Sequence, residues 1–286
     1  MLRNIIKSNY KYSRVYNGNL KAVILDWSGT TVDKYVIAPT EIFYKIFNKY
    51  DIPITMEDAR GPMGLRKDLH IREILKKPEV KKKWIKKYGL EPSNNDIEKM
   101  TNDFIKMQLS TLDNYSKLLP NTSEVVTTLR NLYGLKFGCT TGFNKDMVDI
   151  LLKSSEKQGY IPDSSVAGDE VQNGGRPKPF MLYRNLELLD VHPIQSVLKV
   201  DDTVCGIEEG LEAGCWTVGL SKYSNYMNIN NLDTVTELDN EEYEFKLSKS
   251  QDTLLKSGAH YVIDGIESLP EVVSEINERL RNGEKP

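Results

Sequence analysis

A chain of 286 residues, 39% hydrophobic and 28% charged, is long enough for one large domain or two modest ones with a substantial core. Its 38 basic and 41 acidic side chains give a net charge of −3, which excludes a general attraction to nucleic acid or to an anionic membrane. No apolar stretch is long enough to span a bilayer, and the three cysteines lack a metal-ligand spacing, so a cytoplasmic protein with reduced thiols is expected.

Residues 1–19 form a basic N-terminal leader that contains lysine and arginine but no acidic residue. Two interpretations are open. Such a segment is typical of an organelle-targeting peptide. It is also typical of a frayed leader ahead of the first strand, because chain termini are commonly poorly ordered, and this second interpretation is favoured.

Short apolar runs alternate with helical patterns along most of the chain. Residues 22–25, Ala-Val-Ile-Leu, are apolar and end at Asp26, which is typical of a buried parallel strand. Alternating strands and helices predict a parallel sheet covered on both faces, a Rossmann-like α/β core. The predicted strands are 22–25, 135–139, 196–200, 216–220 and 260–263, and the predicted helices between them are 124–133, 146–158, 180–189 and 207–213.

Residues 38–116 interrupt this alternation, because they show helical patterns and no convincing strand. The predicted helices are 40–50, 55–59, 65–75, 80–88 and 95–109. We therefore expect an all-helical cap domain, 37–114, inserted into a core domain made of 20–36 and 115–286. The polar stretch 225–244, rich in Asn and Asp, predicts a surface loop.

Polar segments suited to phosphoryl chemistry follow or adjoin the predicted strands. They are 26–30 with Asp26 and a glycine, 139–142 with Thr-Thr-Gly, 174–179 with a cation between prolines, and 200–203 with paired carboxylates. Carboxylates suit a hard cation such as Mg²⁺, and hydroxyls with loop amides can hold phosphate oxygens. Each segment alone is a common turn feature, but the four in order predict one site at the carboxyl edge of the sheet.

This order of motifs resembles the haloacid dehalogenase superfamily, whose members use an aspartate nucleophile, often with Mg²⁺ and a helical cap. Phosphatases of that superfamily carry a second Asp two places after the nucleophile, where this chain has Ser28. The more specific resemblance is to the phosphonoacetaldehyde hydrolases (phosphonatases), and it covers nearly all of residues 21–280. The similar segments are 26–33 with 38–39, 59–70, 140–142, 175–177, 199–204 and 258–262.

The resemblance implies a reaction and a set of roles. Phosphonoacetaldehyde and water would give acetaldehyde and phosphate, with Asp26 as nucleophile, Lys67 as the Schiff-base lysine and His70 as a proton shuttle. A structural role for His70 is nearly as well supported, and Met63 is open between packing beside the imine and filling the core. The implied substrate- or phosphate-binding residues are Thr141, Gly142, Arg176, Met63 and Gly64, and the implied Mg²⁺ ligands are Asp26, the Ser28 carbonyl and Asp202. Cap-bearing phosphonatases form homodimers, so a homodimer through the cap is also implied.

A lysine suits this chemistry because breaking a C–P bond expels carbon with its electrons, and a protonated imine can accept them. Lys67 must be neutral to attack an aldehyde, so its pKa must be lowered by desolvation or by a neighbouring cation such as Arg66. Two enzyme hypotheses remain: the phosphonatase, and a related phosphohydrolase or mutase that acts on a small phosphate ester and does not need Lys67. A non-catalytic relative that binds phosphonate is the third.

Three departures from the family pattern bear on the site. Where the family usually has Gly-Asp-Thr-Val-Ser-Asp, residues 201–206 read Asp-Asp-Thr-Val-Cys-Gly, so the second carboxylate is missing and Asp201 is added. Phe143 stands where Tyr is common, and Ser28 where Ala is usual. The altered segment 201–206 puts metal affinity in question.

Overall fold

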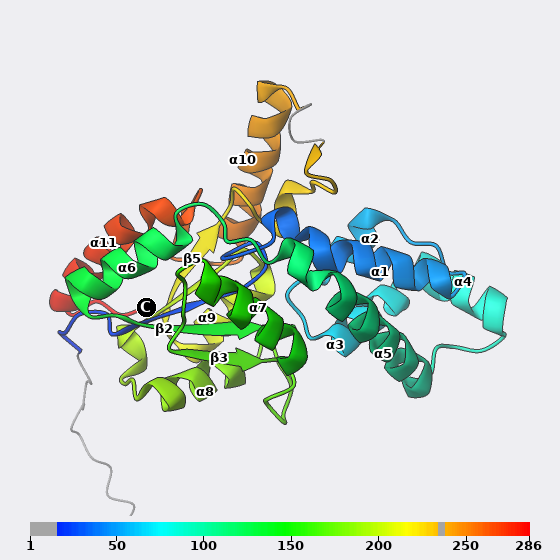
Figure 1. The fold of residues 1–286 in the computed structure, drawn as a ribbon, viewed down its shortest axis with the longest axis horizontal. Coiled ribbons are helices and arrows are strands. Elements are labelled where there is room, and N and C mark those ends of the chain that lie inside the picture. The colour runs from blue at the N-terminus through cyan, green and yellow to red at the C-terminus, as the bar shows by residue number, and fades with distance from the viewer. Residues whose placement is uncertain (1–15, 234–237) are drawn as a thin grey trace, which may run out of the picture.

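The computed structural model describes residues 16–233 and 238–286. Within them the chain forms a six-stranded sheet of order β3-β2-β1-β4-β5-β6 in which every neighbouring pair is parallel (Figure 1). The strands are β1 (Ala22–Leu25), β2 (Lys136–Thr141), β3 (Ser164–Ala167), β4 (Val197–Asp201), β5 (Trp216–Leu220) and β6 (Tyr261–Ile263). The predicted α/β class is confirmed.

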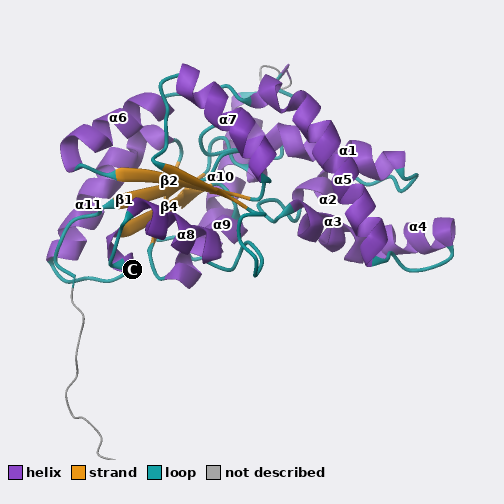
Figure 2. Ribbon diagram, turned by 60° about the horizontal axis from the view of Figure 1, so that its bottom comes forward, coloured by secondary structure: helices purple, strands orange, loops and turns teal. Residues whose placement is uncertain are grey.

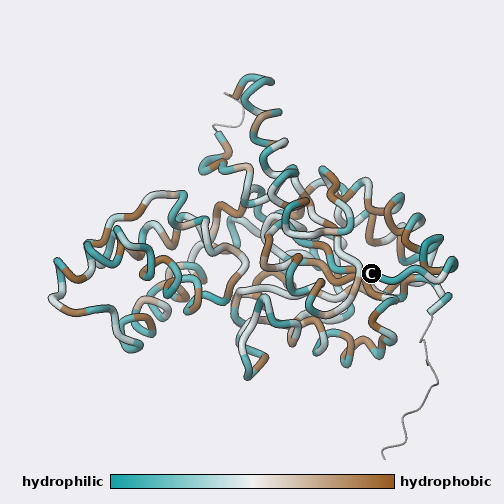
Figure 3. Tube along the Cα trace, turned by 180° about the vertical axis from the view of Figure 1, so that it is seen from behind, coloured by the Kyte–Doolittle hydropathy of each residue, from teal (hydrophilic) through white to brown (hydrophobic). Residues whose placement is uncertain are grey.

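Both faces of the sheet are covered because successive side chains of a strand point to opposite sides. Val23 and Leu25 of β1 join the hydrophobic cluster of one face, whereas Ala22 and Ile24 join the cluster of the other. One face is covered by α6 (Thr122–Tyr133), α7 (Lys145–Lys157) and α11 (Leu269–Arg281), and the other by α8 (Phe180–Leu189) and α9 (Val204–Ala213) (Figure 2). In Figure 3, brown and teal alternate along the helices, as expected for elements with one buried side.

The helical insert follows β1 and lies beyond the carboxyl ends of the strands (Figure 1). It consists of α1 (Ile37–Lys49), α2 (Met56–Arg60), α3 (Lys67–Lys76), α4 (Pro78–Tyr88) and α5 (Asn94–Thr111). Phe43, Ile71 and Phe104, from α1, α3 and α5, are fully buried. They belong to the same hydrophobic cluster as Leu25 of β1, so the insert and the sheet share a continuous core.

Three sequence expectations are corrected. β3 was not predicted, because its Ser-Ser start weakens the apolar signal of a short edge strand. The predicted loop 225–244 is wrong at its end, because α10 (Asn240–Lys256) begins there and the Asp239 side chain caps it by accepting the Glu242 N–H at 2.8 Å. No element was proposed for the stretch that forms α11.

Most of the predicted leader, residues 1–15, lies outside the described residues, as do 234–237 of the predicted loop. In the described parts of the chain, no helix has the length and apolar character needed to cross a membrane.

The chain enters the insert through a strained turn. Asp33, Tyr35 and Val36 have φ values of 55°, 64° and 54°, which side chains rarely adopt and a β-branched residue least of all. The Asp33 carboxylate accepts the N–H groups of Ile37 at 3.1 Å and Ala38 at 3.2 Å, so it satisfies the first turn of α1. Such strain persists only where the surrounding contacts impose it.

Arg60, at the end of α2, supplies many of those contacts. Its guanidinium donates to the Tyr35 carbonyl at 2.7 Å, to the Asn225 carbonyl at 3.3 Å and to the Ile229 carbonyl. Asn225 in turn donates to the Arg60 carbonyl at 3.2 Å and, through its backbone N–H, to Asp202 at 2.9 Å. A buried side chain of the insert is thereby tied to the strained turn and to a carboxylate at the sheet edge.

We expect Arg60→Lys to lower the free energy of unfolding by about 3 kcal/mol, since a lysine ammonium cannot reproduce the guanidinium fork and leaves buried carbonyls unpaired. For a chain of this size that loss lowers the Tm by roughly 6–10 °C. Thermal unfolding followed by circular dichroism measures the shift. Arg72→Lys is the matched control on α3, because Arg72 makes an exposed hydrogen bond to Asn94, and an equal shift in both variants would contradict the anchoring role.

Candidate active site

β1 lies at the point where the strand order reverses, between β2 and β4. In a parallel sheet the crevice outside the carboxyl ends of such strands is the usual binding site. Asp26 directly follows β1, Thr141 ends β2, and Asp201 ends β4. The three predicted strand-end motifs therefore meet at one edge of the sheet, below the helical insert.

A small cavity of about 20 Å³ lies at this edge. Its lining brings together most of the predicted site residues, from the core and from the insert. The lining residues are Asp26, Ser28, Val36, Pro39, Met63, Gly64, Lys67, Thr141, Gly142, Phe143, Arg176 and Thr203. A cavity of this size holds about one water molecule, which is less than the volume of a phosphonate.

Lys67 begins α3 and is buried among aromatic rings. Its Nζ lies 4.6 Å from the ring centroid of Phe143 and 5.7 Å from those of Phe43 and Phe104. Burial lowers the pKa of Lys67 to about 8, with the Asp26 carboxylate acting in the opposite direction. A substantial neutral fraction is therefore present near pH 8.

Arg66 does not assist this shift in the way the sequence suggested. Its guanidinium forms an ion pair with Asp68, with 2.7 Å between Arg66 Nε and Asp68 Oδ1, and both side chains are partly exposed. Burial is the main cause of the lowered pKa of Lys67, and the neighbouring cation that lowers it further is Arg176.

His70 lies one turn after Lys67 on α3 and is fully buried. Its Nε2 is 2.8 Å from the Ala59 carbonyl, which can only accept, so Nε2 carries the proton and Nδ1 is an acceptor. Among the described residues, nothing donates to Nδ1. Burial holds the pKa of His70 well below its usual value, and the ring stacks on Phe43 with 3.7 Å between centroids. The imidazole is therefore neutral, and it offers an unpaired acceptor in the same helical turn as Lys67.

Asp26 is held by a buried arginine. Arg176 Nη2 donates to Asp26 Oδ1 at 2.7 Å, and to the carbonyl and hydroxyl of Thr140 at 3.0 and 2.8 Å. Burial raises the pKa of Asp26 to about 6, while Arg176 acts to lower it. Asp26 is therefore ionised above neutral pH and has a fixed orientation, as a nucleophile requires.

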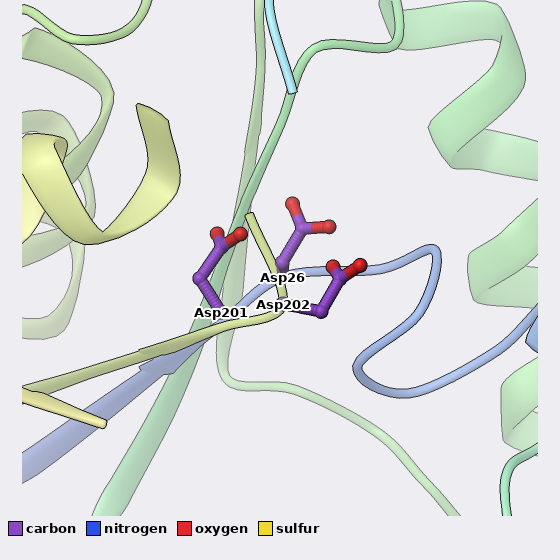
Figure 4. A group of neighbouring side chains, drawn as sticks. All are labelled: Asp26, Asp201 and Asp202. Carbon is purple, nitrogen blue, oxygen red and sulfur yellow. The ribbon is translucent and has the colours of Figure 1, made fainter. Parts of the chain in front are cut away.

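One carboxylate oxygen from each of Asp26, Asp201 and Asp202 lies within 4.8 Å of those of the other two (Figure 4). Burial raises the pKa of Asp202 well above its usual value, and the Asp201 and Asp26 carboxylates raise it further. A divalent cation would offset this repulsion, and buried oxygen donors are the ligands that Mg²⁺ prefers. Asp26 and Asp202, both predicted as ligands, are thus brought together, and Ser28 lines the same cavity.

Two glycines allow the insert to reach the core. Gly64 has φ +94°, and a Cβ there would lie 2.3 Å from Cys205 Sγ, on α9. A Cβ at Gly142 would lie 2.4 Å from the Leu65 carbonyl oxygen. Met63, which is buried, accepts a hydrogen bond from Cys205 Sγ to its carbonyl at 3.2 Å. The loop before α3 therefore packs directly on the core, and its Met63 and Gly64 line the cavity together with Thr141 and Gly142.

Sequence reasoning missed the buried charged side chains that lie behind Asp26. Lys199 and Glu209 are fully buried. Arg176 Nε lies 3.0 Å from Glu209, and Lys199 Nζ donates to the Thr140 hydroxyl at 2.7 Å. The available signal was Lys199 itself, a lysine in the middle of the apolar strand β4, because lysine is almost never fully buried unless it is paired.

Comparison with known proteins places these observations in a family. Residues 20–214 match the model of the haloacid dehalogenase-like hydrolases. The chain is 37% identical to the phosphonoacetaldehyde hydrolase of Syntrophobacter fumaroxidans, over 96% of this chain and 98% of that one. It is 38% identical to the phosphonoacetaldehyde hydrolase of Hahella chejuensis, over 97% and 94%.

A solved structure gives the same result. The crystal structure of a phosphonoacetaldehyde hydrolase-like protein from Oleispira antarctica matches with a TM-score of 0.91 and 35% identity, over 99% of this chain and all of that one. A β-phosphoglucomutase from Clostridium difficile matches with a TM-score of 0.64 and 19% identity, a likeness of fold alone. The chain therefore belongs to the haloacid dehalogenase-like hydrolases and, within them, to the phosphonoacetaldehyde hydrolase family.

Proposed function

We propose that this protein hydrolyses phosphonoacetaldehyde to acetaldehyde and phosphate, through a Schiff base on Lys67 and a phosphorylated Asp26. The observation that carries the proposal is that Lys67 and Asp26 line one small cavity, with the insert supplying the amine and the core the carboxylate. A phosphate ester needs no amine for its cleavage, whereas a C–P bond needs an electron acceptor on carbon.

Imine formation comes first. Neutral Lys67 attacks the aldehyde carbon through Nζ, and loss of water gives a protonated imine. Nδ1 of His70, a neutral acceptor, takes and returns the proton during this exchange. The rings of Phe43, Phe104 and Phe143 exclude water from the imine and face its positive charge, which a π-surface stabilises.

Phosphoryl transfer follows. A carboxylate oxygen of Asp26 attacks phosphorus, the C–P bond breaks, and its electrons pass to the imine, which becomes an enamine. Arg176, Thr141 and the Gly142 amide hold the phosphoryl oxygens, while Met63 and Gly64 close the cavity from the insert. Mg²⁺ bound by Asp26, the Ser28 carbonyl and Asp202 would supply charge that offsets repulsion between the carboxylate and the phosphonate dianion.

Two hydrolyses complete the cycle. Water attacks the phosphorylated Asp26 and releases phosphate. The enamine takes a proton on carbon, and a second water hydrolyses the resulting imine to acetaldehyde and free Lys67. One water is released on imine formation and two are consumed, so the net reaction uses one water.

The test compares two substrates in the presence of Mg²⁺. Phosphate release from phosphonoacetaldehyde, with acetaldehyde in equal amount, is expected, and glycerol phosphate is expected to react slowly because Ser28 is no acid for an oxygen leaving group. Faster turnover of the ester would favour the related phosphohydrolase or mutase. Binding of the phosphonate without any phosphate release would favour a non-catalytic relative.

The pH dependence follows from the pKa of Lys67. We expect kcat/KM for phosphonoacetaldehyde to fall about tenfold for each pH unit below pH 8. Lys67 of the free enzyme has a pKa of about 8, and its protonation removes the nucleophilic amine. Asp26, with a pKa of about 6, is mostly ionised above pH 7, and its protonation steepens the fall as the pH approaches 6. Initial rates from pH 6 to 10 at low substrate measure this, and a profile flat between pH 6.5 and 9 would contradict it.

The family resemblance supports two further proposals about the whole molecule. We propose that residues 37–114 act as a cap domain that opens and closes over the sheet edge, and that the protein is a cytoplasmic homodimer through this cap. Ile85, Tyr88 and Leu90 are exposed apolar residues in and just after α4, which is compatible with such an interface. Light scattering of the full chain decides the oligomeric state, and a monomeric mass at micromolar concentration would refute the dimer.

A further inference from the structure

Asp201 and Gly206, two of the positions that depart from the family pattern, share one volume in the fold. Asp201 ends β4 and Gly206 lies in the first turn of α9, and both are buried. A Cβ built on Gly206 would lie 2.0 Å from both Cγ and Oδ2 of Asp201, and 2.2 Å from Oδ1. Two heavy atoms that are not bonded to each other cannot approach that closely. The carboxylate of Asp201 therefore fills the space into which any side chain at 206 would project.

The donors around Asp201 show what its carboxylate does there. Oδ1 accepts the backbone N–H of Thr203 at 3.0 Å and the Thr203 hydroxyl at 2.7 Å. Oδ2 forms ion pairs with Lys199 Nζ at 3.0 Å and with Arg176 Nη2 at 3.1 Å. Oδ1 is thus satisfied by hydrogen bonds, and Oδ2 is neutralised by two cationic side chains of the chain itself.

Asp202 differs from its neighbour in this respect. Asp202 Oδ2 accepts the Asn225 N–H at 2.9 Å, and Oδ1 lies 3.5 Å from the Thr30 hydroxyl, with no ion pair to a cation among the described residues. In Figure 4 the carboxylates of Asp201 and Asp202 flank that of Asp26. A cation can therefore be shared by Asp26 and Asp202 without displacing any cationic side chain from Asp201.

We propose that Asp201 is a positioning residue, which holds Arg176 against Asp26 from the space of residue 206, and that it is not a third ligand of the cation. Arg176 Nη2 contacts both Asp26 and Asp201, so one guanidinium nitrogen links Asp201, at the end of β4, to Asp26, which follows the neighbouring strand β1. The acidic group required at this place can come from position 201 or from position 206, but not from both. This inference goes beyond the proposed reaction and holds for any substrate that Asp26 attacks.

The experiment relocates the carboxylate. We compare the wild type with Asp201→Gly, Gly206→Asp and the double variant D201G/G206D, all as full chains. The Tm is measured in the presence of a chelator, so that no bound cation contributes. We expect each single variant to lose about 10 °C, one by leaving Arg176 and Lys199 underneutralised and the other by overpacking, and the double variant to regain at least half of that loss.

The matched control places the same new acid at another tight glycine of α9. A Cβ at Gly210 would lie 2.6 Å from Thr217 and 2.8 Å from Lys199, closer to both than to Asp201. D201G/G210D is therefore expected to be less stable than D201G. If the Tm losses of the two single variants simply add in D201G/G206D, the proposal that residues 201 and 206 share one space is rejected. These Tm values do not depend on turnover, so they stand or fall separately from the proposed function.

A conservative variant separates positioning from ligation. Asp201→Asn keeps the shape but turns an amide toward two cations, and it covers the case in which D201G does not fold. We expect phosphate release by D201N to fall about 100-fold, with no recovery at saturating Mg²⁺. Full recovery at high Mg²⁺ would identify Asp201 as a cation ligand and reject the proposal. We expect phosphate release by D201G/G206D to be at least tenfold faster than by D201G, because a carboxylate at position 206 can replace the one lost from position 201.

Discussion

Lys67→Arg is expected to lower phosphate release from phosphonoacetaldehyde by about 10⁴-fold or more, because a guanidinium keeps the charge and the length but is not a nucleophile. Without an imine the C–P bond has no electron acceptor, so the loss falls on kcat rather than on substrate binding. The measurement is single-turnover phosphate release at saturating substrate and Mg²⁺.

Trapping gives an independent view of the same lysine. Borohydride added to the wild type during turnover reduces the imine, and peptide mass analysis is expected to find a two-carbon adduct on Lys67 only. Lys77→Arg is the matched control, since Lys77 lies on the same insert and is paired with Asp58 at 2.8 Å. Wild-type activity in Lys67→Arg, or an adduct elsewhere in the chain, would reject the Schiff-base role.

Asp26→Asn is expected to abolish phosphate release to a similar extent, because an amide oxygen cannot form a phosphorylated intermediate. The variant should still form the imine, since Lys67 and His70 are untouched. The informative result is therefore a split: aldehyde trapped on Lys67 by borohydride, with phosphorus still bound to carbon.

Asp51→Asn is the matched control for this separation of imine trapping from phosphate release. Asp51→Asn removes an exposed carboxylate of the insert that is paired with Lys87 at 2.8 Å, and it should leave both trapping and turnover intact. Phosphate release by Asp26→Asn at more than a few percent of the wild-type rate would reject Asp26 as the nucleophile. Loss of trapping in that variant would instead show that Asp26 is needed to form the imine.

Several elements could be read directly from local pattern. β1, β5 and α8 occur at the predicted boundaries, since an apolar run or an amphipathic face identifies a buried element whatever surrounds it. The insert was recognisable because its helical period extends over the whole span between two strands. β3 and α10 were not, because a short edge strand and a polar helix depend on neighbours more than on their own residues.

The candidate site divides in the same way. Asp26, Thr141 and Asp202 could be placed together from sequence, because parallel strands bring their carboxyl ends to one edge. Lys67 could be named only through a motif, since its burial among Phe43, Phe104 and Phe143 depends on how separate segments pack.

The sequence by itself therefore determined the α/β core, the helical insert and the residues at the strand ends, which depend on periodicity and on the direction of a parallel sheet. The tertiary structure alone decided how the buried charges are paired. Arg60 binds carbonyls more than 160 residues away in the chain, and Asp201 takes the space of Gly206 across a turn. Such contacts depend on distances of a few ångströms between segments, and a linear pattern of residue types carries no such distances.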